Sequence, residues 1–349
     1  MNGLFGVPSP RPFGASLLAE ALADLTRKPR SRTEWEARFA HWQKPASDSE
    51  EQKIDAARRR VGRALGGSTF LPARRWTIIP QGSYHNNTNV RTDSDVDLCV
   101  CLNDAYFTDG PPTDVPTMAE LGLEPLPFTF QDFKDHLAQC MREEYGVSSL
   151  EIGKKALHVH KDDTDRVSVD VVPAFVYRLY GMRQNLLMGR GAPREGIALI
   201  TANGQRITNF PSQHYANGCA KNDRTHRRYK QVVRILKRLR NHMAENVDAT
   251  PLVRSRAKDA ASFLIESLVY NCPDTLFGHS SIHDDVVAVL NFLHQGLGDR
   301  SDGRTLLTLP AWALWVEVNG IKSLFGQGQV WTVQEAIEFV SLARSYMSS

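Results

Sequence analysis

The chain of 349 residues is predicted to be an α+β protein, with a mixed β-sheet and helices in one lobe, a C-terminal helical lobe, and a ligand cleft between them. Two observations favour this class. Short apolar runs of strand type lie before Asn209, whereas after it apolar residues recur at helical spacing. We expect an N-terminal helical segment (residues 1–48), a sheet-bearing lobe (49–208) and a helical lobe (209–349).

Helices are expected before the sheet begins. Two modest helical stretches cover residues 17–25 and 32–43, and Lys44-Pro45-Ala46-Ser47 breaks the second. A third helix, rich in Glu, Lys and Arg, is expected at 49–66, where Gly66-Gly67-Ser68 ends it.

The predicted sheet consists of two single strands and two hairpins. Its strands are expected at residues 75–80, 96–102, 155–160, 167–172, 197–201 and 206–207. A polar turn at 162–165 joins the first hairpin. Asn203-Gly204, the preferred dipeptide of tight hairpin turns, joins the second. One helix, at 129–145, is expected before the first hairpin.

Regular apolar spacing predicts the helices of the helical lobe. Between Thr225 and Met243 the apolar positions are Tyr229, Val232, Val233, Leu236 and Leu239. Further helices are expected at 257–270, 282–296 and 333–347. Thr332-Val333-Gln334-Glu335 is a capping-box pattern and marks the start of the last one.

The composition excludes several classes of protein. No apolar run approaches the ~20 residues of a membrane span, and the first residues show no secretory signal. The five cysteines are scattered, which favours neither a disulfide framework nor a zinc cluster. The net charge of +3 suits anionic ligands such as triphosphates. We therefore expect a cytoplasmic protein with no membrane partner.

Acidic residues at the start of the 96–102 strand are the main chemical signal. In Asp93-Ser94-Asp95-Val96-Asp97 the two-residue period of a strand places Asp95 and Asp97 on one side and Val96 on the other. Partial burial of two adjacent carboxylates is unfavourable unless cations neutralise them. Oxygen ligands of this kind favour Mg²⁺.

A third carboxylate is expected from Asp170, which lies in a valine-rich strand. Alone, it would be interpreted as a paired or capped acid at a strand end. Together with Asp95 and Asp97 it completes the usual ligand set of a two-metal site. A calcium loop is rejected, because Leu98 stands where that loop needs Gly. Asp93 is expected in the loop before the strand.

A Gly-Ser turn follows the first predicted strand. Gly82-Ser83 can hold phosphate with backbone N–H groups. Such dipeptides also fill ordinary turns. Its position, about a dozen residues before the acidic strand, supports the phosphate-binding interpretation.

These motifs together resemble the polymerase-β-type nucleotidyltransferases, and more narrowly the cGAS/DncV-like nucleotidyltransferases (CD-NTases) of bacterial anti-phage signalling. The resemblance covers roughly residues 50–345. In the sheet-bearing lobe, the palm, it rests on Gly82-Ser83, Thr88, Ser94-Asp95-Val96-Asp97 and Asp170-Val171-Val172-Pro173. In the helical lobe it rests on Asn217-Gly218, Lys221-Asn222, the segment 229–237, Ser262 to Leu268, and the segment 324–332.

The resemblance implies a role for each matching residue. Asp95, Asp97 and Asp170 would be the catalytic metal ligands and would hold two Mg²⁺ ions, for which Mn²⁺ can substitute. The donor nucleotide would be bound by Gly82, Ser83, Lys237, Ser262 and Phe263. Of these, Lys237 would contact the triphosphate and Phe263 would stack on a base. From the residues alone, Lys237 could equally face solvent and Phe263 could equally belong to the core.

The resemblance also implies the reaction. The chain would be a Mg²⁺-dependent enzyme that joins NTPs into a cyclic oligonucleotide second messenger for anti-phage (CBASS-type) signalling. We expect a purine cyclic dinucleotide made from ATP and GTP by a monomer, with a regulatory protein partner left open. No zinc-dependent nucleic-acid sensing is expected. Two alternatives stay open: an RNA-tailing or 2′-5′ oligoadenylate-type enzyme, and an inactive nucleotide-binding scaffold.

Two further features of the sequence have a local interpretation. The basic segment 224–240 is expected to supply part of a positively charged cleft wall, with its remaining residues in solvent. His158 and His160 share one strand face and are interpreted as surface residues, since further metal ligands are not evident nearby.

Overall fold

The computed structural model describes residues 28–29, 31–45, 50–68, 70–71, 75–90, 95–122, 124–161, 167–181, 192–246, 249–298 and 310–348. The expected helix at 17–25, the loop residue Asp93 and the polar turn at 162–165 lie outside these residues.

A mixed sheet forms one lobe, as the sequence predicts, and it has seven strands. The strand order is β1-β2-β5-β4-β3, and β6 pairs with the far half of β5 and with β7. The strands are β1 (Trp76–Gln81), β2 (Val96–Asp109), β3 (Leu150–Ile152), β4 (Leu157–Val159), β5 (Val169–Leu179), β6 (Arg194–Ile200) and β7 (Arg206–Asn209). The central strands β2 and β5 run parallel and the other pairs are antiparallel.

Both predicted hairpins are present. The second strand of the first hairpin, β5, runs to Leu179, beyond its predicted end at residue 172, and the sheet differs from the prediction in two further ways. β3, a short edge strand paired with β4, was not predicted. The predicted 96–102 strand continues to Asp109, because a bulge between Leu102 and Tyr106 lets β2 shift register and go on pairing with β5.

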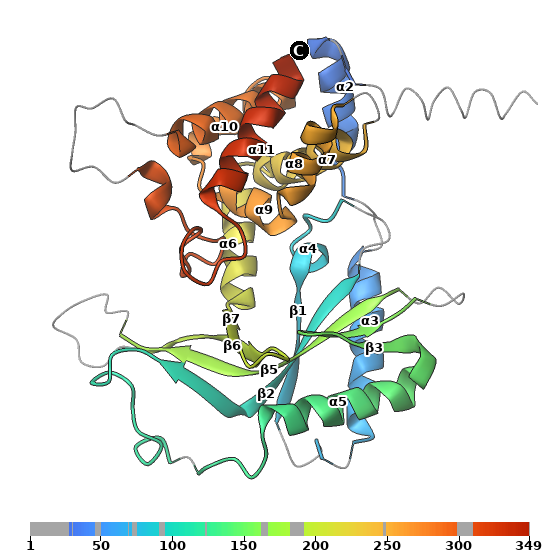
Figure 1. Ribbon diagram of the computed structural model, residues 1–349, viewed down its shortest axis with the longest axis vertical. Coiled ribbons are helices and arrows are strands. Elements are labelled where there is room, and N and C mark those ends of the chain that lie inside the picture. Colours follow the sequence, from blue (N-terminus) through green and yellow to red (C-terminus); the bar gives the residue numbers. More distant parts are fainter. Residues whose placement is uncertain are drawn as a thin grey trace, which may run out of the picture.

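One face of the sheet is covered by α3 (Glu50–Gly66), which runs alongside the strands in Figure 1, and by α5 (Phe130–Tyr145), which lies below them. Val96, Leu98, Val100 and Leu102 of β2 point into this core. Thr129 and Asp132 form a capping box that fixes the start of α5. The alternate residues of β2 therefore face the opposite side, toward the helical lobe.

The helical lobe lies above that side of the sheet and is entered through β7 and α6 (Figure 1). Its helices are α6 (Pro211–Arg224), α7 (Arg228–Glu245), α8 (Pro251–Asp259), α9 (Ser262–Tyr270), α10 (Ile282–Leu297) and α11 (Val333–Ser348). The single helix predicted at 257–270 is wrong. Ala260 and Ala261 adopt extended backbone angles, and Arg240 donates to the Ala260 carbonyl at 2.8 Å, so the chain breaks between α8 and α9.

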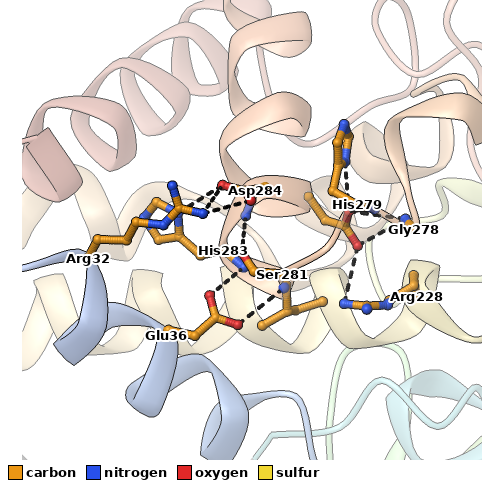
Figure 2. A network of polar contacts seen from close by, with 10 residues as sticks. Arg32, Glu36, Arg228, Gly278, His279, Ser281, His283 and Asp284 are labelled. Atoms are coloured by element: carbon orange, nitrogen blue, oxygen red, sulfur yellow. Dashed lines mark hydrogen bonds and ion pairs between the residues drawn. The ribbon is translucent and has the colours of Figure 1, made fainter.

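The N-terminal helix α2 (Arg32–Trp42) packs against the helical lobe. Trp35, Phe39 and Trp42 enter its core, and Trp35 also meets Tyr346 of α11 edge to face. A polar network joins α2 to the start of α10 (Figure 2). Here Glu36 accepts from the Ile282 and His283 N–H groups, and Arg32 pairs with Asp284 at 2.8 Å. Within the described residues, no helix is long and apolar enough to cross a membrane.

Candidate active site

Two of the three predicted carboxylates lie directly opposite each other near the start of the two central strands. Asp97 in β2 and Asp170 in β5 are paired in the parallel register, and Asp95 precedes β2 by one residue. Their alternation with the buried Val96 and Leu98 agrees with the predicted strand phase. The structure therefore brings Asp95, Asp97 and Asp170 to one place.

The electrostatics of this group favour a cation. Burial and the neighbouring Asp170 and Asp95 carboxylates raise the pKa of Asp97 to about 7. Burial also raises the pKa of Asp170, although the adjacent His158 imidazole opposes the shift. Among the described residues, no three Asp, Glu, His or Cys side chains are already arranged as a closed metal cage. The donor set nevertheless fits a hard divalent ion, because such an ion would relieve the repulsion that raises the Asp97 pKa.

The Gly82-Ser83 turn packs against one of these carboxylates, Asp97. Gly82 starts the short helix α4 (Gly82–His85) with φ +75°, and a Cβ atom there would lie 1.8 Å from the Asp97 Oδ2 atom. Only glycine tolerates both this backbone conformation and this approach. The phosphate-binding turn predicted from sequence is thus packed directly onto the predicted metal ligand.

A cleft of about 510 Å³ separates the two lobes. From the palm it is lined by Gly82, Ser83 and Asp97, and from the helical lobe by Lys237, Ser262 and Phe263. Its volume lies in the range of ligand sites, ~300–1,000 Å³. All five residues predicted to bind nucleotide therefore line one cavity. A second, polar cavity of about 430 Å³ meets it at Ser83, Lys237 and Ser262.

Ser262 and Phe263 form the first turn of α9 at the cleft wall. The N-cap, Ala261, provides no side-chain hydrogen bond to this helix end. Phe263 is half-buried and stacks on Trp331 with ring centroids 5.6 Å apart and planes at 28°. It thus lies at the cavity, where its ring could meet a base.

Lys237 lies at the cleft but is nearly enclosed, with 2% of its surface exposed. Its Nζ atom donates to Glu266 at 2.8 Å and to the Thr88 hydroxyl at 3.0 Å. The opposite oxygen of Glu266 meets His214 at 2.9 Å. Burial opposes ionisation of Glu266, but Lys237 and His214 hold the pKa of this carboxyl well below its usual range.

The basic segment 224–240 supplies part of the cleft wall through Lys237, as predicted, but most of its other described cations pair with neighbouring elements instead of facing solvent. These side chains form hydrogen bonds or ion pairs with residues of other helices and loops. For example, Arg224 pairs with Asp274, Arg234 donates to the Asn87 carbonyl, and Arg240 donates to the Ala260 carbonyl. The basic side chains therefore act mainly as links between elements, a role that spacing along one helix does not reveal.

Sequence reasoning missed several residues at the cleft or in contact with the predicted metal ligands. His158 lies opposite Asp170 in the β4–β5 register and contacts its carboxylate at 2.5 Å, so it is more than a surface histidine. His85 stacks on Tyr215 across the lobes at 4.2 Å, and Trp331 supports Phe263. The register of the predicted hairpin could have revealed the first contact. The others depend on packing between distant segments.

Comparison with known proteins places this geometry in context. Residues 216–348 match the family model described as the cGAS/DncV-like nucleotidyltransferase C-terminal helical domain. The chain is similar to a cyclic dipyrimidine nucleotide synthase of Legionella pneumophila, with 38% identity over 90% of this chain and 98% of the relative. It is also similar to a cyclic dipurine nucleotide synthase of Elizabethkingia meningoseptica, with 28% identity over 89% and 98%.

A solved structure supports the same relationship. The c-UMP-AMP synthase of Rhodothermus marinus, solved with Apcpp and Upnpp, superposes with a TM-score of 0.73 and 25% identity. The superposition covers 92% of this chain and 97% of that one. The shared fold therefore includes both the palm and the helical lobe.

Proposed function

The chain belongs to the cGAS/DncV-like nucleotidyltransferase family, and from this premise we propose that it joins two nucleoside triphosphates into a cyclic dinucleotide. A ribose hydroxyl of one nucleotide attacks the α-phosphate of the other, and pyrophosphate leaves. A second attack within the linear intermediate closes the ring and releases a second pyrophosphate.

One observation carries this proposal. Asp97, which is paired with Asp170 on the neighbouring strand, packs against the Gly82-Ser83 turn and lines with it the palm side of a cleft whose other side includes Ser262. Nucleotidyl transfer needs a triphosphate held next to a site of concentrated negative charge that cations can neutralise. The Ser83 hydroxyl and the N-terminus of α9 provide donors for the triphosphate from two sides.

Asp95, Asp97 and Asp170 would hold Mg²⁺, with Mn²⁺ as a substitute. Such ions would neutralise charge on the attacking and leaving oxygens. The chain's own contribution is to hold the carboxylates in register on β2 and β5 and to keep Gly82 against Asp97. Chelation with EDTA should abolish product formation, and added Mg²⁺ or Mn²⁺ should restore it.

The bases of the product stay a prediction. A purine product was expected from the resemblance, but the relatives include enzymes named for dipyrimidine, dipurine and mixed products. Phe263 with Trp331 offers a stacking surface, which any base can use. To identify these bases, all four NTPs are supplied together and each is then withheld in turn. The NTPs whose omission stops product formation are the substrates.

The cellular role is proposed from family membership. A cyclic dinucleotide made in the cytoplasm would act as a second messenger in anti-phage (CBASS-type) defence. The expected monomer and the regulatory protein partner remain predictions, and light scattering of the purified chain would test the first of them.

The experiment that tests the function incubates the purified protein with Mg²⁺ and labelled ATP, GTP, CTP and UTP, followed by phosphatase. A compact phosphatase-resistant product supports cyclisation. A ladder of lengths would instead favour the RNA-tailing or 2′-5′ oligoadenylate-type alternative. Absence of any product would favour the nucleotide-binding scaffold.

A further inference from the structure

The Asp170 carboxylate has a hydrogen-bond partner on the neighbouring strand. His158 of β4 lies opposite Asp170 of β5 in the antiparallel register, and its Nδ1 atom lies 2.5 Å from Asp170 Oδ1. An ionised carboxylate can only accept hydrogen bonds, so His158 Nδ1–H is the donor. The contact therefore fixes one oxygen of the carboxylate relative to the sheet.

The imidazole ring of His158 is confined on its other edge by Gly153, in the turn between β3 and β4. A Cβ atom on Gly153 would lie 2.7 Å from His158 Nε2 and 2.9 Å from Cδ2, closer than real side chains approach. Because Gly153 has no side chain, the ring fits between this turn and Asp170. A larger residue there would push the ring out of place.

The turn that confines the ring is itself fastened to α5. Lys134 of α5 is 5% exposed and donates to the Gly153 carbonyl at 3.0 Å. The Gly153 N–H donates to the Ala156 carbonyl at 2.9 Å. A series of contacts therefore runs from α5 through the turn and His158 to the Asp170 carboxylate.

Asp170 needs such support because its neighbours repel it. Asp97 lies opposite it on β2, and Asp95 lies one residue before that strand. Carboxylates this close favour orientations in which they turn away from one another. The hydrogen bond from His158 opposes that rotation. Each carboxylate oxygen has two acceptor sites, so the bond leaves both oxygens of Asp170 able to bind an ion.

We propose that His158 is a positioning residue that holds the Asp170 carboxylate in the orientation in which it binds a divalent ion. His158 acts through Asp170. The inference deepens the proposed function and rests on it, because ion binding by Asp170 is part of that proposal. Hydrogen-bonded partners of metal ligands typically contribute about 10- to 100-fold in metal affinity or activity, which sets the size of the expected effect.

Substitutions of His158 separate the hydrogen bond from the bulk of the ring. His158→Leu removes the donor and is expected to fold, because this side chain is 39% exposed. His158→Val makes the same comparison with a residue that favours strands. His158→Asn places an amide donor near the position of Nδ1 and tests rescue. His160→Leu is the matched control, because it removes an imidazole two residues further on, which is 55% exposed and faces Glu151 at 3.5 Å.

The first readout needs no turnover: the melting temperature of each protein is followed as Mn²⁺ is added without nucleotide. An ion that binds only the folded chain raises this temperature. His158→Leu and His158→Val should need about ten times more Mn²⁺ than the wild-type protein for the same rise. His158→Asn and His160→Leu should stay within about threefold of the wild-type protein. Asp97→Asn, which removes a neighbouring ligand, should lose most of the rise.

The second readout is pyrophosphate release from the four NTPs as a function of Mg²⁺ concentration. In His158→Leu the Mg²⁺ concentration for half-maximal rate should rise about tenfold, and high Mg²⁺ should recover part of the lost rate. A merely structural role would lower the amount of active protein without changing its metal dependence.

Three results would overturn the role of His158. One is a His158→Leu protein that matches His160→Leu in its Mn²⁺ dependence. Another is a His158→Asn protein as impaired as His158→Leu, and the third is a wild-type melting temperature that Mn²⁺ does not raise.

The proposed function can fail separately. If the wild-type protein releases no pyrophosphate but His158→Leu shows the shift in Mn²⁺ dependence, the proposed function is contradicted and the role of His158 stands. If the wild-type protein turns over NTPs and His158→Leu has unchanged metal dependence, the role of His158 is contradicted and the proposed function stands.

Discussion

At the residue scale, the contact between Gly82 and Asp97 links the phosphate-binding turn to the metal ligands. The left-handed φ of Gly82 and the 1.8 Å approach of a virtual Cβ to Asp97 Oδ2 leave no room for a side chain. The sequence could show that Gly82 precedes the acidic strand, but it could not show that the two residues touch. That contact depends on the β1–β2 pairing, which sets Gln81 opposite Asp97.

Gly82→Ala is therefore expected to displace Asp97 and reduce kcat/KM at least ~100-fold. Gly204→Ala is the matched control, since Gly204 has a similar φ of +80° but nothing within 4 Å of its virtual Cβ. The control should lose about 1 kcal/mol of stability from backbone strain and keep its activity. Equal activity of the two variants would show that the close contact is unimportant.

At the element scale, the α2 interface contains a histidine that should make stability depend on pH. Burial and Arg38 lower the pKa of His242 in α7 to about 4, and its ring packs edge to face on Trp42 and Tyr346. The folded pKa lies below the unfolded value of ~6.5, so the unfolded chain binds the proton more readily. Stability from this group is present above pH ~6.5 and is lost as pH falls toward about 4.

Between pH 7 and pH 4.5 the free energy of unfolding is expected to fall by about 1–2 kcal/mol because of this group, after a discount for the partial solvent access of the ring. His242→Gln should reduce this part of the pH dependence, and urea unfolding at several pH values would measure it. If both proteins lose stability in parallel as the pH falls, His242 is not the responsible group.

The local sequence pattern predicted most helices and strands correctly, but it did not predict the contacts between them. Hydrophobic period and capping residues predicted α5, α7, α10 and α11 within a few residues, and Asn203-Gly204 predicted the β6–β7 hairpin. The break between α8 and α9 was missed because Ala260-Ala261 contains no helix breaker, and the break depends on Arg240, which is distant in sequence. The Lys237–Glu266 pair was missed for the same reason.

At the scale of the whole molecule, the cleft requires both lobes, and α2 helps to complete the core of the helical one. Trp35 of α2 is 2% exposed and contacts Phe39, Trp42 and Tyr346. Trp35→Ala is expected to lower the free energy of unfolding by about 3–5 kcal/mol, because it leaves a cavity in this core. Leu252→Ala, at a position 65% exposed, is the control and should be nearly neutral.

Because α2 lies outside the cleft, Trp35→Ala should lower the melting temperature while kcat/KM, measured well below that temperature, stays close to the starting value. A large loss of kcat/KM in a folded Trp35→Ala protein would mean that α2 also shapes the cleft.

The central claim is that carboxylates on β2 and β5 support nucleotidyl transfer to a cyclic product. Asp97→Asn tests it most directly, because it keeps the size of the side chain and removes a charge that burial and two neighbouring carboxylates oppose. We predict a phosphatase-resistant cyclic dinucleotide from the wild-type protein with Mg²⁺ and four NTPs. In Asp97→Asn we predict that the rate of product formation falls by several orders of magnitude. The melting temperature of this variant, measured without metal, should be unchanged or higher. Turnover of the folded variant near the wild-type rate would contradict the account.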